Sequence, residues 1–135
     1  MSLAIGKAAL FFSFSFCLPL LLSLPLHAAE LTLEPQVGFH GLFQLGHPFP
    51  LRVDLTNSGR PVEGTVEIRL WKGGASRGVG GYPFYHQREV FLSAQSRKSI
   101  QFTVDPDSLS RPLTVSFLSP TFKVSKEIDL RRYFT

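Results

Sequence analysis

The segment best suited to ligand chemistry is a glycine-rich run, Gly73-Gly74-Ala75-Ser76-Arg77-Gly78-Val79-Gly80-Gly81. Successive backbone N–H groups in such a run can surround an anion, and Arg77 would add a positive charge. The run lacks the Gly-Lys-Ser/Thr sequence that opens a helix in a phosphate-binding P-loop. A surface loop between two strands is therefore the simpler interpretation, with Arg77 as a candidate binding residue.

Aromatic residues flank this run: Trp71 precedes it, and Tyr82, Phe84 and Tyr85 follow it. Aromatic rings stack on sugars and anchor protein partners, although they also close the ends of small hydrophobic cores. Trp71 lies off the alternation of the apolar residues before it, which indicates exposure or the end of a strand. We therefore take Trp71, Tyr82 and Tyr85, together with Arg77, as candidate binding residues.

The sequence gives little indication of catalysis or metal binding. The letters Gly-x-Ser-x-Gly occur at Gly74-Ala75-Ser76-Arg77-Gly78, but inside the glycine-rich run rather than at the strand-to-helix turn that the nucleophile motif requires, and the single cysteine, Cys17, lies in the apolar N-terminal segment. His40, His47 and His86 lack the spacing of metal ligands. Asp105-Pro106-Asp107 is more typical of a turn than of a calcium loop, whose other oxygen ligands are missing. We expect no catalytic site, no metal and no cofactor, and hence a protein that is not an enzyme.

Residues 1–29 are typical of a secretory signal peptide. Lys7 supplies the positive charge, residues 8–26 are apolar, and small residues precede Glu30. We expect cleavage after Ala28 or Ala29 and an extracytoplasmic product, either periplasmic or secreted. The alternative is a membrane anchor formed by uncleaved residues 8–26, a run close to the ~20 residues that cross a bilayer, although prolines and serines interrupt it.

Residues 30–135 are expected to form one domain. Apolar and polar residues alternate through most of it, as in strands with one buried and one solvated face. Seven segments show this alternation, with apolar positions at Leu31, Leu33 and Val37; Leu51, Val53 and Leu55; Val66, Ile68 and Leu70; Val90 and Leu92; Ile100, Phe102 and Val104; Leu113, Val115 and Phe117; and Phe122, Val124, Ile128 and Leu130. The sequence predicts an all-β, immunoglobulin-like or fibronectin-like β-sandwich of about seven strands after an N-terminal signal helix.

Two local features add detail to this prediction. Lys126 shares the alternation of Val124 and Ile128, so it indicates either a bulge or an inward charge that protects a sheet edge. Between the first two strands, glycines at 38, 41 and 46 allow positive φ angles. The apolar residues among and after them are expected to plug one end of the sandwich: Phe39, Leu42, Phe43, Leu45 and Phe49.

The stretch from Gly38 to Trp71 resembles the N-terminal β-sandwich of a group of uncharacterised bacterial envelope proteins. It carries their Gly-x-x-Gly-x-aromatic-x-x-Gly pattern from Gly38, followed by Pro-x-x-Val-x-Leu-x-Asn-x-Gly from Pro50 and Gly-x-hydrophobic from Gly64. The resemblance implies a β-sandwich fold and an extracytoplasmic location, and it implies no catalytic residues. Many such proteins continue into further domains and a membrane helix, so it also implies either a truncated form or a stand-alone module.

Charge and composition narrow the class of partner. The chain has 14 basic and 10 acidic residues, dispersed without a Lys/Arg-rich run, so we expect no nucleic-acid partner. We expect a non-catalytic envelope module that contacts another protein or the missing C-terminal domains of a longer one. The alternative is a carbohydrate- or cell-wall-binding module. An apolar patch at the C-terminal end would favour protein contact, and a clustered, exposed aromatic face would favour sugar binding. Membrane contact is expected only through uncleaved residues 8–26.

Overall fold

The computed structural model describes residues 30–73 and 80–135. Within them the chain forms seven strands and one short 3-10 helix, η1, so the predicted all-β class and all seven strands are confirmed. The predicted signal segment, residues 1–29, lies outside the described residues. The elements are β1 (Leu31–Val37), β2 (Phe49–Asn57), β3 (Val62–Lys72), β4 (Tyr82–Leu92), β5 (Ser96–Val104), β6 (Leu113–Leu118), β7 (Lys123–Ile128) and η1 (Leu130–Arg132).

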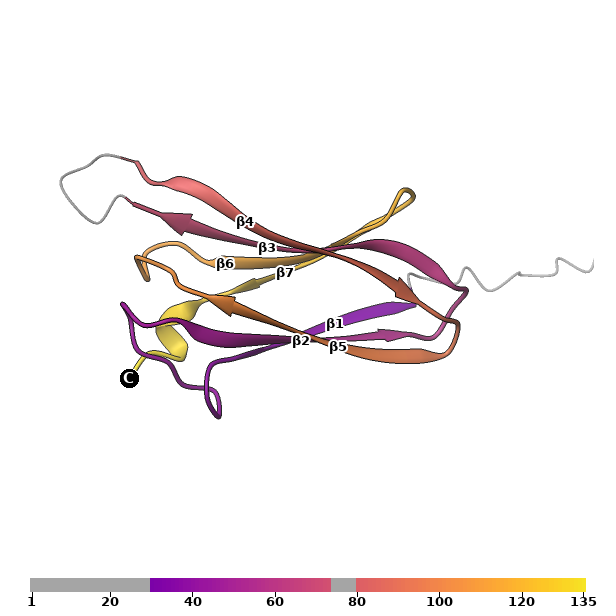
Figure 1. Cartoon of the computed structure of the whole chain (residues 1–135), viewed down its shortest axis with the longest axis horizontal. Coiled ribbons are helices and arrows are strands. Elements are labelled where there is room, and N and C mark those ends of the chain that lie inside the picture. Colours follow the sequence, from indigo (N-terminus) through magenta and orange to yellow (C-terminus); the bar gives the residue numbers. More distant parts are fainter. Residues whose placement is uncertain (1–29, 74–79) are drawn as a thin grey trace, which may run out of the picture.

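The strands form two antiparallel sheets that lie face to face (Figure 1). The first has three strands in the order β1-β2-β5, and the second has four in the order β4-β3-β6-β7. β1 approaches β7 on one side of the molecule, and β4 approaches β5 on the other. Each sheet therefore has one inner face against the other sheet and one outer face toward solvent.

The core lies between the two sheets and is built from the alternating apolar positions of all seven strands. Because side chains alternate across a strand, Val66, Ile68 and Leu70 all point inward from β3, and all three are buried. Gly64 continues this inner row, where a Cβ atom would lie 2.5 Å from the ring of Phe117. A side chain there would overlap the core, so this position requires glycine.

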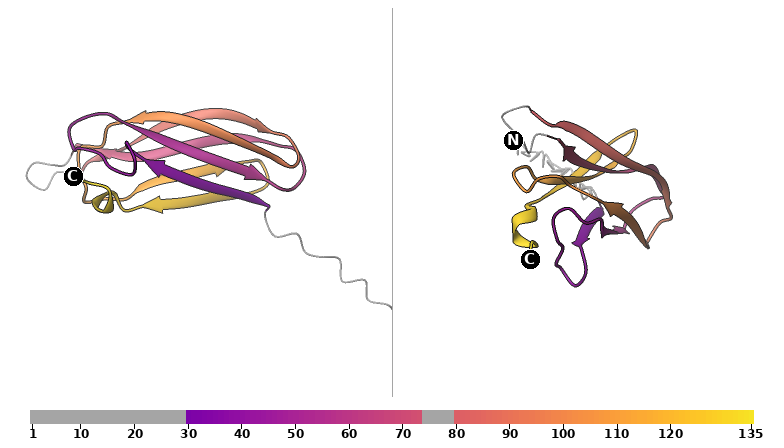
Figure 2. Two further views of the ribbon diagram at one scale, coloured as in Figure 1. Left: turned by 90° about the horizontal axis from the view of Figure 1, so that it is seen from below. Right: turned by 60° about the vertical axis from the view of Figure 1, so that its left-hand side comes forward.

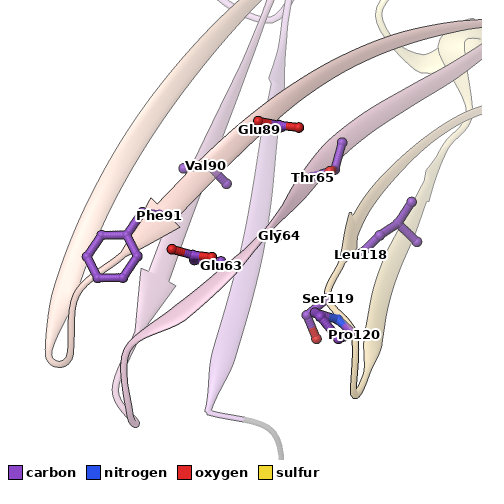
Figure 3. Close-up of a pocket in the computed structure, with 9 residues that line it drawn as sticks. All are labelled: Glu63, Gly64, Thr65, Glu89, Val90, Phe91, Leu118, Ser119 and Pro120. Carbon is purple, nitrogen blue, oxygen red and sulfur yellow. The ribbon is translucent and has the colours of Figure 1, made fainter.

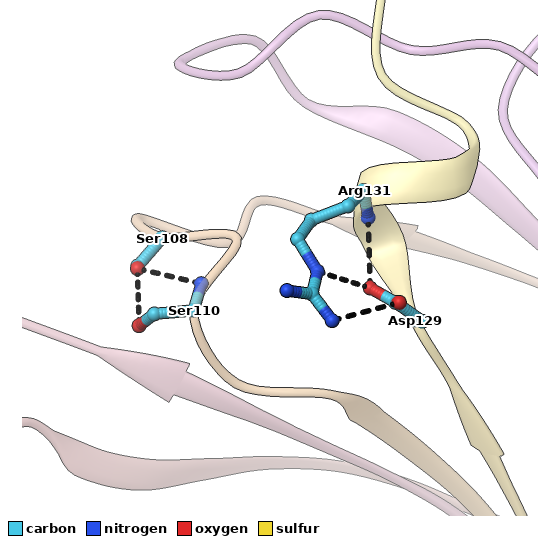
Figure 4. A network of polar contacts seen from close by, with 4 residues as sticks. All are labelled: Ser108, Ser110, Asp129 and Arg131. Atoms are coloured by element: carbon cyan, nitrogen blue, oxygen red, sulfur yellow. Dashed lines mark hydrogen bonds and ion pairs between the residues drawn. The ribbon is translucent and has the colours of Figure 1, made fainter.

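The last predicted strand ends earlier than its alternation suggested. β7 stops at Ile128, and Leu130 begins η1 instead of continuing the strand, although its side chain is buried as expected. Asp129 caps η1: its Oδ1 accepts hydrogen bonds from the backbone N–H of Arg131 and from Nε of the same residue (Figure 4). Because this cap satisfies a backbone donor locally, the chain turns away from the sheet after Ile128.

Lys126 lies on an edge strand, and β6 and β7 pair in regular register from Leu113 opposite Ile128 to Leu118 opposite Lys123. The bulge that was one explanation for Lys126 is therefore wrong. Its inward-facing position and its exposure fit the other explanation, a charge that discourages a further strand from pairing with this edge.

The two ends of the molecule carry different connections. The β1–β2 connection, the start of β4, the β5–β6 connection and the C-terminus gather at one end, which we call the C-terminal end (Figures 1 and 2). At the other end Asn57 joins two turns: its Nδ2 donates to the carbonyl oxygens of Arg60 and Ser93, and its Oδ1 accepts from the N–H of Gly59.

Candidate functional site

The predicted aromatic residues lie at the C-terminal end but on two faces of the four-stranded sheet. Trp71 pairs with Pro83, and Tyr85 pairs with Arg69, so Trp71 and Tyr85 share the outer face. Tyr82 has the opposite orientation, that of the inward-facing residues of β4. Arg77 lies outside the described residues. The register therefore divides the predicted binding residues, because adjacent residues of a strand point to opposite faces.

Trp71 is half-buried and partly covered. The guanidinium carbon of Arg111, from the β5–β6 connection, lies 4.0 Å from the centre of its ring, in a cation–π contact. Tyr85 is 47% exposed and Tyr82 is 61% exposed. The three rings thus form no common platform, and the largest of them, the indole of Trp71, already has the guanidinium of Arg111 stacked on it.

The Asp105–Asp107 turn holds the end of β3. Lys72 Nζ lies 3.3 Å from Asp105 Oδ2 and 3.2 Å from Asp107 Oδ1, and Asp107 Oδ2 accepts a 2.8 Å hydrogen bond from the N–H of Gly73. Burial disfavours the charged form of Lys72, but the two carboxylates outweigh it and raise its pKa. The Gly73 N–H, followed by Lys72, lowers the pKa of Asp107. These carboxylates therefore have a structural role in holding β3 to the β5–β6 connection.

Other titratable groups give little indication of chemistry. Burial, followed by the charge of Lys72, lowers the pKa of His86, whose ring packs edge-on against Phe84. Within residues 30–73 and 80–135 there is no group of three or more His, Cys, Asp or Glu side chains placed to hold a metal ion.

The most exposed apolar surface lies at the C-terminal end, on the β1–β2 connection. We define the loop-end patch as Phe39, Leu42, Leu45 and Phe134, whose exposed fractions are 67%, 49%, 37% and 48%. The prediction that the first three plug the core was wrong, whereas Phe43 and Phe49 are buried as predicted.

A tight turn explains why Phe39 and Leu42 leave the core. The N–H of each donates to the carbonyl oxygen of the other, which closes a two-residue loop of His40 and Gly41. Both loop residues have positive φ, 54° and 83°, as in a type I′ hairpin turn. The small hairpin projects its two apolar side chains beside one another. Gly38, at φ 65°, is required next to it, because a Cβ atom there would overlap the carbonyl group of Leu42.

The patch is attached to the core through Phe43. Its ring centre lies 4.2 Å from that of buried Phe49. Its backbone N–H donates to the carbonyl oxygen of Tyr133, and its carbonyl oxygen accepts from the N–H of Thr135. These bonds fix Phe134 beside the β1–β2 connection, where Figure 2 shows the C-terminus. An adjoining hollow of about 370 Å³ is lined by Phe39, Leu42, Phe43, Gln44, His47, Pro48, Phe49 and Thr135.

Sequence reasoning missed this patch for an identifiable reason. It assigned the apolar residues near Gly41 to the core by type, although no alternation supported burial there. Phe134 was not singled out, because only the three-dimensional pairing with Phe43 brings it to the β1–β2 connection. The available signal was the combination of glycines and large apolar residues in one connection, since connecting segments run over the surface.

The fold and this surface define a class: a small two-sheet all-β domain with an exposed apolar patch next to its C-terminus. Residues 30–131 match a family model described as a domain of unknown function, DUF8726, and the chain belongs to this family. No curated protein matches the chain. Among the described residues, no helix combines the length and the hydropathy needed to cross a membrane.

Proposed function

We propose that this chain is a non-catalytic, extracytoplasmic module that binds another protein of the bacterial envelope through the loop-end patch. The observation that carries the proposal is the exposure of Phe39, Leu42 and Leu45 on the β1–β2 connection together with Phe134, which the Phe43 bridge holds beside that connection. Isolated exposed apolar residues are ordinary, but a contiguous group bordered by polar residues is typical of a contact surface. Gln44, His47 and Thr135 supply such a border at the adjoining hollow.

The local geometry suits the patch to binding. Residues that are already ordered lose less conformational entropy when a partner binds, so less of the contact energy is lost. The I′-like turn orders Phe39 and Leu42, and the bonds from Phe43 to Tyr133 and Thr135 order Phe134. Aromatic and aliphatic side chains at the centre of an interface commonly contribute most of its binding energy. We therefore place the main contact at Phe39 and Phe134.

We propose a fibronectin-like sandwich as the finer description of the fold. In the immunoglobulin constant-type arrangement the fourth strand lies in the sheet of the first, second and fifth strands. Here β4 pairs with β3 instead, which gives the orders β1-β2-β5 and β4-β3-β6-β7. Of the two related sandwiches that the sequence predicted, this order supports the fibronectin-like one.

We also propose that residues 1–29 are a signal peptide removed on export, leaving Ala29 or Glu30 as the first residue. The charged start, the apolar run and the small residues before Glu30 support this. N-terminal sequencing of the protein recovered from an envelope extract would test it. A chain that begins at Met1 would contradict cleavage and support the anchor formed by residues 8–26.

Carbohydrate binding has weaker support. A sugar-binding platform needs open aromatic faces, whereas Arg111 occupies one face of Trp71 and Tyr82 lies on the other side of the sheet. Binding of the chain to peptidoglycan that Trp71→Ala abolishes would nevertheless replace our proposal with the carbohydrate alternative.

The patch is tested with exposed positions, where substitution should leave folding intact. We expect Phe39→Ser combined with Phe134→Ser to abolish cross-linking to one defined envelope protein, because the central apolar contacts are lost. Tyr82→Ser is the matched control: it removes an equally exposed aromatic ring at the same end of the molecule, outside the patch. Equal cross-linking by the double variant and the wild type, with melting temperatures unchanged, would contradict the proposal.

A further inference from the structure

The outer face of the four-stranded sheet can be mapped row by row from the strand register. Five rows cross the sheet, each containing side chains that point away from the core. From the end nearest Pro120 to the C-terminal end they are Phe91 and Glu63; Glu89, Thr65, Leu118 and Lys123; Gln87, Glu67, Ser116 and Ser125; Tyr85, Arg69, Thr114 and Glu127; and Pro83 and Trp71. Arg111 extends the last row by covering Trp71.

Charges are arranged with opposite polarity on the two sides of this face. On β3 and β4 the carboxylates Glu63 and Glu89 lie at the end nearest Pro120, Glu67 lies in the central row, and Arg69 lies toward the C-terminal end, where Arg111 of the β5–β6 connection covers Trp71. On β7 the order is reversed, with Lys123 at the first end and Glu127 at the second. Turning the face end over end therefore brings unlike charges together toward both ends of the face, whereas Glu67 of the central row comes to face Glu67 of the other copy.

The shapes at the two ends are also complementary. At the end nearest Pro120 there is a hollow of about 620 Å³, which Glu63 and Glu89 border together with the 52% exposed ring of Phe91 and, across Gly64, Leu118 (Figure 3). At the C-terminal end the stacked pair of Trp71 and Arg111 covers the sheet. A cationic aromatic pair facing an acidic, partly apolar hollow combines charge attraction with the burial of a ring.

We propose that two copies of this chain associate through these outer faces, related by a two-fold axis that lies in the interface and runs across the strands. The Trp71–Arg111 pair of each copy then lies over the hollow of the other, so that Arg111 faces Glu63 of the second copy. Lys123 of each copy faces Glu127 of the other. A two-fold axis makes each of these contacts twice, as in most homodimers.

The charges concerned are available for these contacts. In the part of the chain that the structure describes, no ion pair is formed by Glu63, Glu89, Arg111, Lys123 or Glu127. The face spans about 27 Å along β3 and, in its three middle rows, about 19 Å across four strands, so it covers at most about 500 Å² in plan for each copy. That area places the complex among weak, reversible associations rather than permanent dimers. We therefore expect a dissociation constant of about 10–500 µM, and we expect added salt to weaken the association.

Charge reversal tests this arrangement. Sedimentation velocity over a concentration series, on the chain as recovered from cells, should show the wild type moving from monomer to dimer. Glu63→Arg places two arginines opposite each other at both contacts, and Arg111→Glu places two glutamates there. Each variant alone should therefore weaken association at least about tenfold. An equimolar mixture of the two variants restores both attractive contacts and should dimerise within about threefold of the wild type.

Further variants provide controls and an independent contact. Arg97→Glu makes the same change of charge on the three-stranded sheet and should leave association unchanged. Because Arg111→Glu also removes the contact with Trp71, the same mixing experiment is repeated with Lys123→Glu and Glu127→Lys, two exposed residues of β7. A wild type that stays monomeric to about 1 mM, well beyond weak specific association, would overturn the proposal. So would a dimer whose strength no single variant changes, or single variants whose mixtures remain monomeric in both pairs.

Discussion

The outer faces of the two sheets use their charged residues in different ways. On the three-stranded sheet, Gln36 Nε2 donates a 3.1 Å hydrogen bond to Asp54 Oδ2, and Arg52 Nη2 donates to Gln36 Oε1. Arg52 Nε also lies 3.7 Å from Asp54 Oδ1. On the four-stranded sheet, Glu63 and Glu89 lie at the edge of a hollow and make no ion pair with any described residue.

This difference separates charges that stabilise the domain from charges that are available to a partner. Asp54 is almost fully buried beneath its own neighbours, so its hydrogen-bonding capacity is used within the sheet. The carboxylates beside the hollow remain solvated and keep their capacity for an incoming cation. In the part of the chain that the structure describes, the outer face of the four-stranded sheet thus combines carboxylates that make no ion pair with a hollow bordered by the 52% exposed ring of Phe91.

The largest expected effect tests whether the two sheets depend on the core that lies between them. Phe102, on β5, is 6% exposed, and its ring contacts the guanidinium of Arg88 on β4 of the other sheet. Phe102→Ala should lower the free energy of unfolding by about 3–5 kcal/mol, because it leaves a cavity between the sheets. Urea denaturation would measure the change. A value near zero would mean that the sheets do not depend on each other at this point.

A smaller effect should distinguish the two faces directly. Asp54→Ala removes the acceptor of Gln36 and the partner of Arg52, and should cost about 1–2 kcal/mol of stability. Glu89→Ala, on the four-stranded sheet, should change stability by less than about 0.5 kcal/mol. Equal costs in urea denaturation would remove the distinction between an internally paired face and an available one.

Much of the fold could be predicted because it depends on local alternation. Leu51, Val53 and Leu55 alternate with polar residues, and all three are fully buried. The pairing of β4 with β3 rather than with β5 is a different matter, because it depends on contacts between distant segments. Alternation says which face of a strand is apolar, but it does not say which strand lies beside it.

The candidate site was harder to predict for two physical reasons. Phe39 is exposed because His40 adopts a positive φ, an uncommon conformation for a residue other than glycine that composition alone does not indicate. Phe134 joins the patch only through its bridge to Phe43. Trp71 and Tyr82 were grouped by their nearness in sequence. Tyr82 pairs with Lys72 and shares its face of the sheet, and Lys72 is the neighbour of Trp71 in β3, so Trp71 and Tyr82 lie on opposite faces.

The smallest expected effect depends on pH and compares a paired carboxylate with an unpaired one. The N–H of Gly73, and after it Lys72, hold the pKa of Asp107 below its ordinary value of 3.8. A carboxyl whose pKa is lower in the folded chain than in the unfolded chain stabilises the fold above the unfolded value. That contribution is lost as the pH falls below about 3.8 and through the folded value, where the group takes up a proton in both states.

Asp107→Asn should therefore lower the melting temperature at about pH 6, and the difference from the wild type should shrink as the pH falls from about 4 to 2. Glu89→Gln is the control, because this carboxylate makes no ion pair with a described residue, and its difference from the wild type should stay small throughout. The effect of Asp107 itself should be modest, since its side chain is 39% exposed and water screens its attraction to Lys72. A difference for Asp107→Asn that stays constant across the acid range would show that the hydrogen bond from Gly73 does not depend on the charge. The carboxylate would then act as a neutral turn residue, like the serines of the same connection, rather than as the partner of Lys72.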